Sequence, residues 1–139
     1  MIIMAMDLGK ARTGIAVSDA MESFAFPKEV ITEYNTERLV EKLTAAAKKY
    51  GAELIVAGLP KNMDGTSGSR AEECAEIAEK VRLASGIETV LWDERCTTVA
   101  AYTALDAAGT YGKKRKQAVD AVAATIILVG FLSFRKNNR

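Results

Sequence analysis

The first third of the chain alternates short apolar runs with tight polar connections. Residues 2–7 and 13–18 are both strand-like, and the short glycine-containing segment between them predicts a hairpin. A third extended segment runs from about residue 24 to 32, and Pro27 within it indicates an edge or irregular strand. The pattern therefore predicts three consecutive antiparallel strands.

Apolar residues then recur at helical spacing, with short apolar runs in between. Leu39 and Leu43 share one face of a predicted helix, which Asn35 or Thr36 can cap and Gly51 can end. Further helices are expected at about residues 69–85, 97–109 and 117–134, and buried strands at residues 54–57 and 89–92. The glycine-rich segment 58–70 and the basic segment 113–116 are expected to be loops.

This order of elements predicts an α/β fold. Three antiparallel strands followed by alternating helices and strands imply a mixed five-stranded sheet with helices on both faces. With 139 residues and no internal repeat or linker, the chain is expected to form a single domain over residues 1–139.

Composition restricts the chemistry that is open to this chain. It contains no histidine, which excludes Ser-His-Asp and Cys-His nucleophile systems and a typical catalytic zinc site. If the protein is an enzyme, its chemistry must therefore depend on carboxylates, lysines, hydroxyls and a hard metal ion.

Nothing in the sequence indicates export or a membrane. The apolar start lacks a basic region, and the apolar run 121–134 is too short to span a bilayer, so it predicts a buried helix. Cys74 and Cys96 lack metal-binding spacing and are expected to be reduced thiols. A cytoplasmic location is expected.

Charge is unevenly distributed although the net charge is only +1. Residues 1–112 carry 12 basic and 17 acidic side chains, whereas residues 113–139 carry seven basic and one acidic. The basic part begins with Lys113, Lys114, Arg115 and Lys116. Such a run indicates either nucleic-acid contact or a solvated loop.

Three carboxylates stand out by position. Asp7 ends the first apolar strand, Glu94 follows the last strand, and Asp120 falls in the first turn of the predicted final helix. Sites in α/β sheets form beyond the carboxyl ends of the strands, so the three acids could meet there and bind one or two Mg²⁺ or Mn²⁺ ions. Gly9 and Gly14 beside Asp7 leave room for backbone, metal or phosphate to approach.

Each acid also has a simpler explanation. Asp120 could complement the dipole of its helix, and Asp93 and Glu94 could be ordinary polar residues after a strand, with Arg95 as a partner. Asp7 is harder to explain in this way, because a turn aspartate would normally lie within the turn. Asp19, at the next strand end, is better explained as a turn residue.

The chain resembles the RuvX/YqgF family, whose members are described as Holliday junction resolvases and, in bacteria, as nucleases for the 5′ end of pre-16S rRNA. The resemblance covers almost the whole chain. It is carried by Asp7-Leu8-Gly9 with Arg12 and Gly14-Ile15-Ala16-Val17-Ser18-Asp19, by Gly58-Leu59-Pro60 with Asp64-Gly65 and Gly68-x-Arg70, by Trp92-Asp93-Glu94-Arg95 with Thr97-Thr98, and by Lys116 with Val119-Asp120 and Ala123-Ala124.

The resemblance implies a ribonuclease H-like fold, a divalent metal such as Mg²⁺ or Mn²⁺, and a nucleic-acid substrate, either pre-rRNA or branched DNA. The family pattern places the metal-binding acids at Asp7, Glu94 and Asp120, and Arg12, Arg70 and Arg95 become further candidates for binding nucleic acid. The ribosome or its precursor is a possible partner, and the chain is expected to be a monomer or homodimer.

Two other functions fit parts of the pattern. One is a phosphate-binding domain of the actin, sugar-kinase and Hsp70 class, whose first hairpin has a similar Asp-x-Gly pattern; those proteins bind nucleotide between two such domains. The other is a non-catalytic RNA-binding or ribosome-associated factor with the same fold. The nuclease hypothesis accounts for all three acids.

Overall fold

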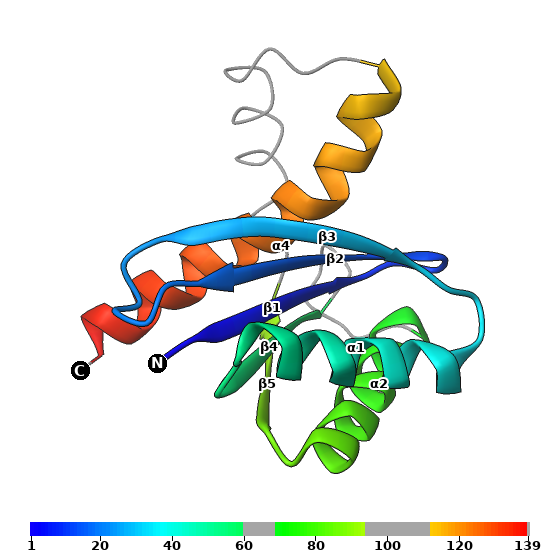
Figure 1. Ribbon diagram of the computed structural model, residues 1–139, viewed down its shortest axis with the longest axis horizontal. Coiled ribbons are helices and arrows are strands. Elements are labelled where there is room, and N and C mark those ends of the chain that lie inside the picture. Colours follow the sequence, from blue (N-terminus) through cyan, green and yellow to red (C-terminus); the bar gives the residue numbers. More distant parts are fainter. Residues whose placement is uncertain (60–68, 94–111, 139) are drawn as a thin grey trace.

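The protein is built on one mixed sheet with helices on both faces (Figure 1). The computed structural model describes residues 1–59, 69–93 and 112–138, with side chains described outside 112–121. The strands are β1 (Ile3–Leu8), β2 (Arg12–Ser18), β3 (Ala25–Thr32), β4 (Leu54–Leu59) and β5 (Glu88–Asp93). The helices are α1 (Thr36–Tyr50), α2 (Ser69–Ser85) and α4 (Gly112–Asn137).

The strand order is β3-β2-β1-β4-β5. β1, β2 and β3 pair antiparallel, as predicted, and β4 pairs parallel with both β1 and β5, so the sheet is mixed. β3 lies at the edge, and its register shifts where Ile15 pairs with Glu29 and Ala16 pairs with Pro27. Pro27 has no N–H to give to a ladder, so its place on an edge strand with an irregular register is the one expected.

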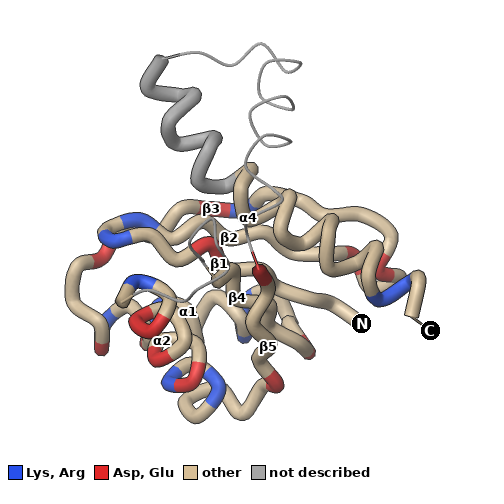
Figure 2. The backbone as a smooth tube through the Cα atoms, turned by 180° about the vertical axis from the view of Figure 1, so that it is seen from behind, with Lys and Arg blue, Asp and Glu red and all other residues tan. Residues whose placement is uncertain are grey.

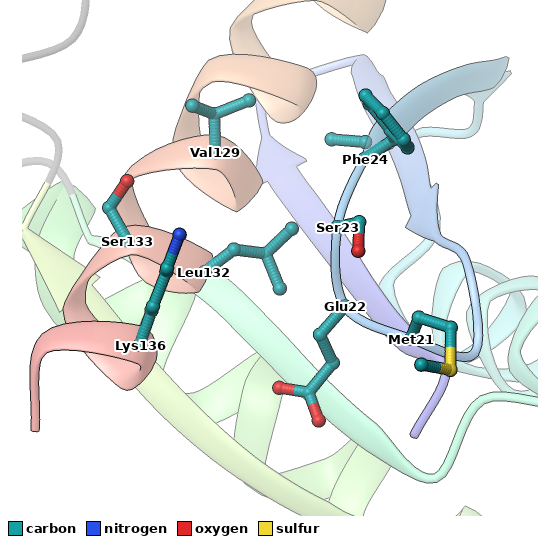
Figure 3. Close-up of a pocket in the computed structure, with 9 residues that line it drawn as sticks. Met21, Glu22, Ser23, Phe24, Val129, Leu132, Ser133 and Lys136 are labelled. Carbon is teal, nitrogen blue, oxygen red and sulfur yellow. The ribbon is translucent and has the colours of Figure 1, made fainter. Parts of the chain in front are cut away.

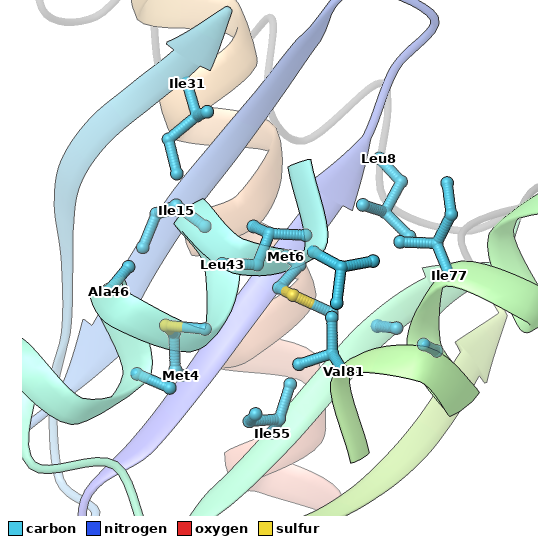
Figure 4. Close-up of a cluster of buried hydrophobic side chains, with 14 of the residues drawn as sticks. Met4, Met6, Leu8, Ile15, Ile31, Leu43, Ala46, Ile55, Ile77 and Val81 are labelled. Atoms are coloured by element: carbon cyan, nitrogen blue, oxygen red, sulfur yellow. The ribbon is translucent and has the colours of Figure 1, made fainter. Parts of the chain in front are cut away.

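Alternate residues of each strand divide between two cores, because successive side chains point to opposite faces of a sheet. Met4, Met6 and Ile15 face α1 and α2, where they pack against Leu43 and Val81 (Figure 4). On the other face, α4 covers a second core.

The second core contains Ile3, Ala5, Ala16, Leu54, Val56, Ala124, Ile127, Leu128, Phe131 and Leu132. The apolar run that begins near residue 121 is therefore a packed helix, as predicted. Among the helices of the described ranges, none has an apolar stretch long enough to cross a bilayer.

The predicted ends of α1 are confirmed. The Asn35 side chain accepts a hydrogen bond from the Arg38 backbone N–H at 3.0 Å, and Gly51 ends the helix with a φ of 70°. Such a φ favours glycine because a Cβ is strained there. The capping residues in the sequence were therefore sufficient to predict where this helix begins and ends.

The predicted start of the last helix is wrong. α4 begins at Gly112, so residues 113–116 are helical and do not form a loop. Lysine, arginine and glutamine are good helix formers, and no proline or glycine interrupts residues 113–129. Asp120 is consequently the ninth residue of α4 and not part of its first turn. The predicted helix at about 97–109 lies outside the described residues.

Candidate active site

Asp7 lies near the carboxyl end of β1, on the face that α4 covers. Ile3 and Ala5 belong to the core beneath α4, and strand alternation places Asp7 on the same side. The residue is half-buried. A carboxylate thus occupies the position that continues an apolar row of the sheet.

The residues next to Asp7 on the neighbouring strands are both glycines. Gly14 of β2 pairs directly with Asp7. On the other side, Gly58 of β4 follows Ala57, the partner of Met6, and so continues the same parallel register. Because neither glycine carries a side chain, a metal ion or a phosphate can approach the carboxylate closely. The prediction for Gly14 agrees with this arrangement, and Gly58 is an addition from the structure.

Gly9 serves the turn between β1 and β2. Its N–H donates to the Arg12 carbonyl oxygen at 3.0 Å, and a Cβ on Gly9 would lie 2.4 Å from that oxygen. The backbone therefore approaches Gly9 closely, which was one of the predicted reasons for a glycine there. The turn stays short, so the end of β1 is held against the start of β2.

Arg70 and Cys74, both from α2, also hold this end of β1. Arg70 Nη2 donates to the Leu8 carbonyl oxygen at 2.7 Å, and Cys74 Sγ lies 3.7 Å from the same oxygen. Arg70 Nη1 also forms an ion pair with Glu73 at 2.8 Å. The structure thus gives Arg70 a contact one residue from Asp7, while its predicted binding of nucleic acid stays a prediction. Cys74 is buried.

Arg12 begins β2 and lies on the same face of the sheet as Asp7. It is two residues from Gly14, the partner of Asp7, and strand alternation puts both positions on the α4 side. Arg12 is half-buried. A cationic position therefore borders the candidate site, while the binding of nucleic acid by Arg12 stays a prediction.

The carboxyl ends of β1 and β5 lie at the same edge of the sheet, since both strands run parallel to β4. With two strand spacings between them, their backbones are about 10 Å apart. β5 ends at Asp93, which pairs with Leu59 on the α1/α2 side, whereas Trp92 packs toward α4. Asp93 therefore lies on the face opposite to Asp7.

Trp92 fixes β5 against α4. Its ring lies edge-on to Phe131 with centroids 5.6 Å apart and also contacts Phe134 at 5.4 Å. Edge-to-face pairs of this kind add specific geometry to apolar burial. The end of β5 and the C-terminal half of α4 are therefore held together next to the face that carries Asp7.

Several predicted site residues cannot be placed by their side chains. Glu94 and Arg95 lie outside the described residues, as does Cys96, which was expected to be a reduced thiol and not a site residue. Asp120 and the basic residues Lys113, Lys114, Arg115 and Lys116 fall within α4, where only the backbone is described. Among the described side chains, no three potential ligands lie together as a metal site.

The new start of α4 weakens the simpler explanation for Asp120. A helix dipole favours an acid within the first turn, and its effect falls off beyond that turn. As the ninth residue of α4, Asp120 lies outside this range. The helix dipole therefore does not account for Asp120.

Asp19, the acid at the end of β2, has a local role. Its Oδ1 accepts hydrogen bonds from the backbone N–H groups of Ser23 and Phe24, both at 2.8 Å. The Phe24 N–H in particular lowers the pKa of this exposed carboxyl. The sequence-based interpretation of Asp19 as a turn residue is confirmed.

A pocket of about 510 Å³ lies at the other end of the sheet (Figure 3). Leu132 of α4 points into it toward the β2–β3 connection, which contributes Met21 and Phe24. Glu22 in this connection also contacts the amino group of Met1, so the pocket lies near the start of β1. It is therefore remote from the carboxyl edge that carries Asp7.

A family model described as "RuvX: Holliday junction resolvase" matches residues 1–134. The chain belongs to the RuvX family. A protein of Bacillus cytotoxicus named "Putative pre-16S rRNA nuclease" is 43% identical over 135 residues, which are 95% of this chain and 98% of that relative. The RuvX assignment thus rests on nearly the full length of both chains.

Solved structures share the fold of this RuvX family member. The Thermus thermophilus RuvC structure in complex with a Holliday junction substrate matches with a TM-score of 0.66 at 14% identity, covering 99% of this chain and 96% of that chain. A ROK hexokinase from Thermus thermophilus matches with a TM-score of 0.50 at 21% identity, covering 73% of this chain and 38% of that chain. RuvC-like resolvases have a ribonuclease H-like fold, so the predicted fold class is confirmed.

Proposed function

We propose that this protein is a divalent-metal-dependent nuclease that hydrolyses phosphodiester bonds, and that its substrate is the 5′ end of pre-16S rRNA. The observation that carries the proposal is the position of Asp7. Its carboxylate continues an apolar row at the carboxyl edge of the sheet, between two positions without side chains. The name of the Bacillus cytotoxicus relative supports the choice of RNA.

Two contacts of Glu22 support the proposal that Asp120 lies near Asp7. Glu22 accepts hydrogen bonds from the Met1 amino group at 3.1 Å and from Arg135 Nε at 2.6 Å, so position 135 of α4 lies beside the start of β1. From there α4 runs back along the sheet, opposite in direction to β1 (Figure 1). Position 120 is about 22 Å along a straight helix from position 135, and Asp7 is about 20 Å along a strand from Met1. The two acids are therefore at similar levels.

The helical repeat supports the same conclusion. Position 120 precedes the buried Ala124 by four residues, and residues four apart lie on the same stripe of a helix. Ala124 belongs to the core between α4 and the sheet, so the stripe that includes position 120 is the one that α4 turns toward the strands. β5, which Glu94 follows in the sequence, ends at the same edge of the sheet.

We assign metal binding to Asp7, Glu94 and Asp120. Oxygen ligands of this kind suit Mg²⁺ or Mn²⁺, and Gly14, the partner of Asp7, places no side chain against such an ion or a phosphate. When bound, the metal would supply activation of water and stabilisation of the leaving oxygen. Arg70 holds the Leu8 carbonyl and thereby positions Asp7, and the basic positions 113–116 would hold phosphates of the substrate.

Cleavage of a Holliday junction is the second candidate function. The description of the family model and the fold shared with RuvC favour it. The family assignment favours a nuclease over the ATP-binding class. The likeness to the ROK hexokinase points the same way, because it covers only 38% of that chain, whereas proteins of the ATP-binding class bind nucleotide between two such domains. The two nuclease candidates differ in substrate and share the same acids.

The experiment compares cleavage of a pre-16S leader RNA and a four-way DNA junction by the wild type and by Asp7→Asn. We expect cleavage of the leader RNA in Mg²⁺ or Mn²⁺, none in chelator, and a loss of at least ~100-fold for Asp7→Asn. The matched control is Asp19→Asn, which removes an exposed acid that bonds to the backbone of its own turn, and it should cleave like the wild type. Undiminished cleavage by Asp7→Asn would show that the site is wrong, and cleavage of the junction alone would favour the second candidate.

A further inference from the structure

A polar pocket of about 390 Å³ adjoins the candidate active site. It lies on the α1/α2 side of the same sheet edge, where the turn between β1 and β2 supplies Gly9 and Lys10. The connection between β3 and α1 forms another wall and is joined to that turn, since Glu33 N–H donates to the Ala11 carbonyl oxygen at 2.9 Å. The walls of the pocket are therefore parts of the structure that also hold the end of β1.

The pocket is within reach of a substrate that is bound at Asp7. Lys10 follows Asp7 by three residues, which span at most about 11 Å of extended chain. The intervening turn is compact, because Gly9 bonds to Arg12 across it. A nucleic-acid strand with one phosphate beside Asp7 can cross this compact turn and place an adjacent nucleotide in the pocket.

Tyr34 at the pocket is unusually exposed for an aromatic residue. It is 82% exposed, although a tyrosine ring gains free energy when its apolar surface is covered. Nucleobases stack on such rings, and stacking tolerates any base because every base has a π-face. An exposed ring at the side of a pocket next to a phosphodiester-cleaving site suits an unpaired base.

The charges around the pocket favour a base over a phosphate inside it. Glu73 and Glu76 line the wall from α2, and acidic positions follow one another along that helix (Figure 2). Glu73 is paired with Arg70, whereas the carboxylate of Glu76 repels phosphate and can accept hydrogen bonds from the N–H groups of a base. Lys10 at the turn is the exposed cation that can meet the phosphate of the same nucleotide.

Building on the proposed nuclease function, we infer that this pocket binds an unpaired nucleobase next to the scissile phosphate, stacked on Tyr34 with its N–H edge toward Glu76. The enzyme would thereby select a single-stranded segment beside the cleaved bond. Arg70 supports the pocket and the active site together, because it contacts both Glu73 and the Leu8 carbonyl.

The test measures binding without cleavage, so that it does not depend on the nuclease activity. Asp7→Asn protein in chelator is titrated with a fluorescent single-stranded leader RNA, alone and combined with Tyr34→Ala or Tyr34→Phe. We expect Tyr34→Ala to raise Kd about 5- to 150-fold, the range for loss of one stacked base. Tyr34→Phe keeps the ring and should bind like tyrosine. The dependence of binding on salt should be the same for all three, since no charge changes.

Phe24→Ala is the matched control, because Phe24 is a 66% exposed aromatic residue at the remote 510 Å³ pocket. It should leave Kd unchanged, and a fully paired duplex of the same sequence should show no effect of Tyr34→Ala. The inference is overturned if Tyr34→Ala binds the single strand as well as its parent, if Tyr34→Phe loses as much as Tyr34→Ala, or if the duplex is affected equally. Loss of cleavage in Asp7→Asn together with unchanged binding in Tyr34→Ala would leave the nuclease and remove only this subsite.

Discussion

The contact between Glu22 and Arg135 should make the stability of this protein depend on pH in the acidic range. The Glu22 side chain is 10% exposed and accepts a hydrogen bond from Arg135 Nε at 2.6 Å. That hydrogen bond, with help from the Met1 amino group, lowers the pKa of Glu22 from 4.5 to about 2. Because this contact fixes α4 along the sheet, its strength also bears on where Asp120 is held.

The sign follows from the lowered pKa. The folded protein holds the Glu22 proton less tightly than the unfolded chain, so the contribution to the free energy of unfolding is complete above about pH 5 and is lost as the pH falls toward about 2. The separation of the folded and unfolded pKa values corresponds to about 3 kcal/mol. Arg135 is 28% exposed, and screening by water reduces this figure, so we expect about 2 kcal/mol.

The perturbation is Glu22→Gln, which keeps the shape of the side chain and removes its charge. Urea unfolding of both proteins between pH 7 and pH 2 should give a difference of about 2 kcal/mol at neutral pH that shrinks toward zero at the acidic end. Glu79→Gln is the matched control, because Glu79 pairs with Arg82 on the exposed surface of α2 and should contribute less than about 0.5 kcal/mol. A difference that is absent at pH 7, or that does not change with pH, would refute the reasoning.

Two further predictions concern α4. If Asp120 faces Asp7 and Glu94 as proposed, Asp120→Asn should melt above the wild type in chelator, because it removes one of three like charges. In millimolar Mn²⁺ it should melt below the wild type, because the metal would stabilise the folded wild type by RT ln(1 + [L]/Kd). Equal destabilisation in both conditions would remove Asp120 from the proposed metal site. Replacing the four basic residues 113–116 with serine should weaken nucleic-acid binding and flatten the slope of log K against log salt by up to ~3 units. A slope that stays the same would mean that these residues do not contact phosphate.

The sequence predicted the elements that depend on local signals. Both ends of α1 were predicted from Asn35 and Gly51, because capping and a left-handed φ are local properties. The irregular edge strand followed from Pro27. The start of α4 was missed because the density of charge at 113–116 was interpreted as a loop, although those residue types favour helix.

The site was predicted only in part, for a physical reason. The position of Asp7 at a strand end can be read from neighbouring residues, whereas its second glycine neighbour, Gly58, depends on which strand pairs with β1. The contact between Arg70 and Leu8 joins residues 62 positions apart, and that between Glu22 and Arg135 joins residues 113 apart. Such contacts depend on the packing of helices on the sheet, which periodicity alone does not specify.

The irregular β3 strand has a consequence for the protein in concentrated solution. An exposed sheet edge is a template on which a strand from another molecule can pair, and this pairing is a common first step toward aggregation. On β3, Pro27 has no N–H to donate to an added strand, and the register shift leaves Lys28 without a partner in β2, so the edge is irregular there. This side of the sheet is thereby protected against self-association, even though the rest of the strand is extended and rich in β-forming residues.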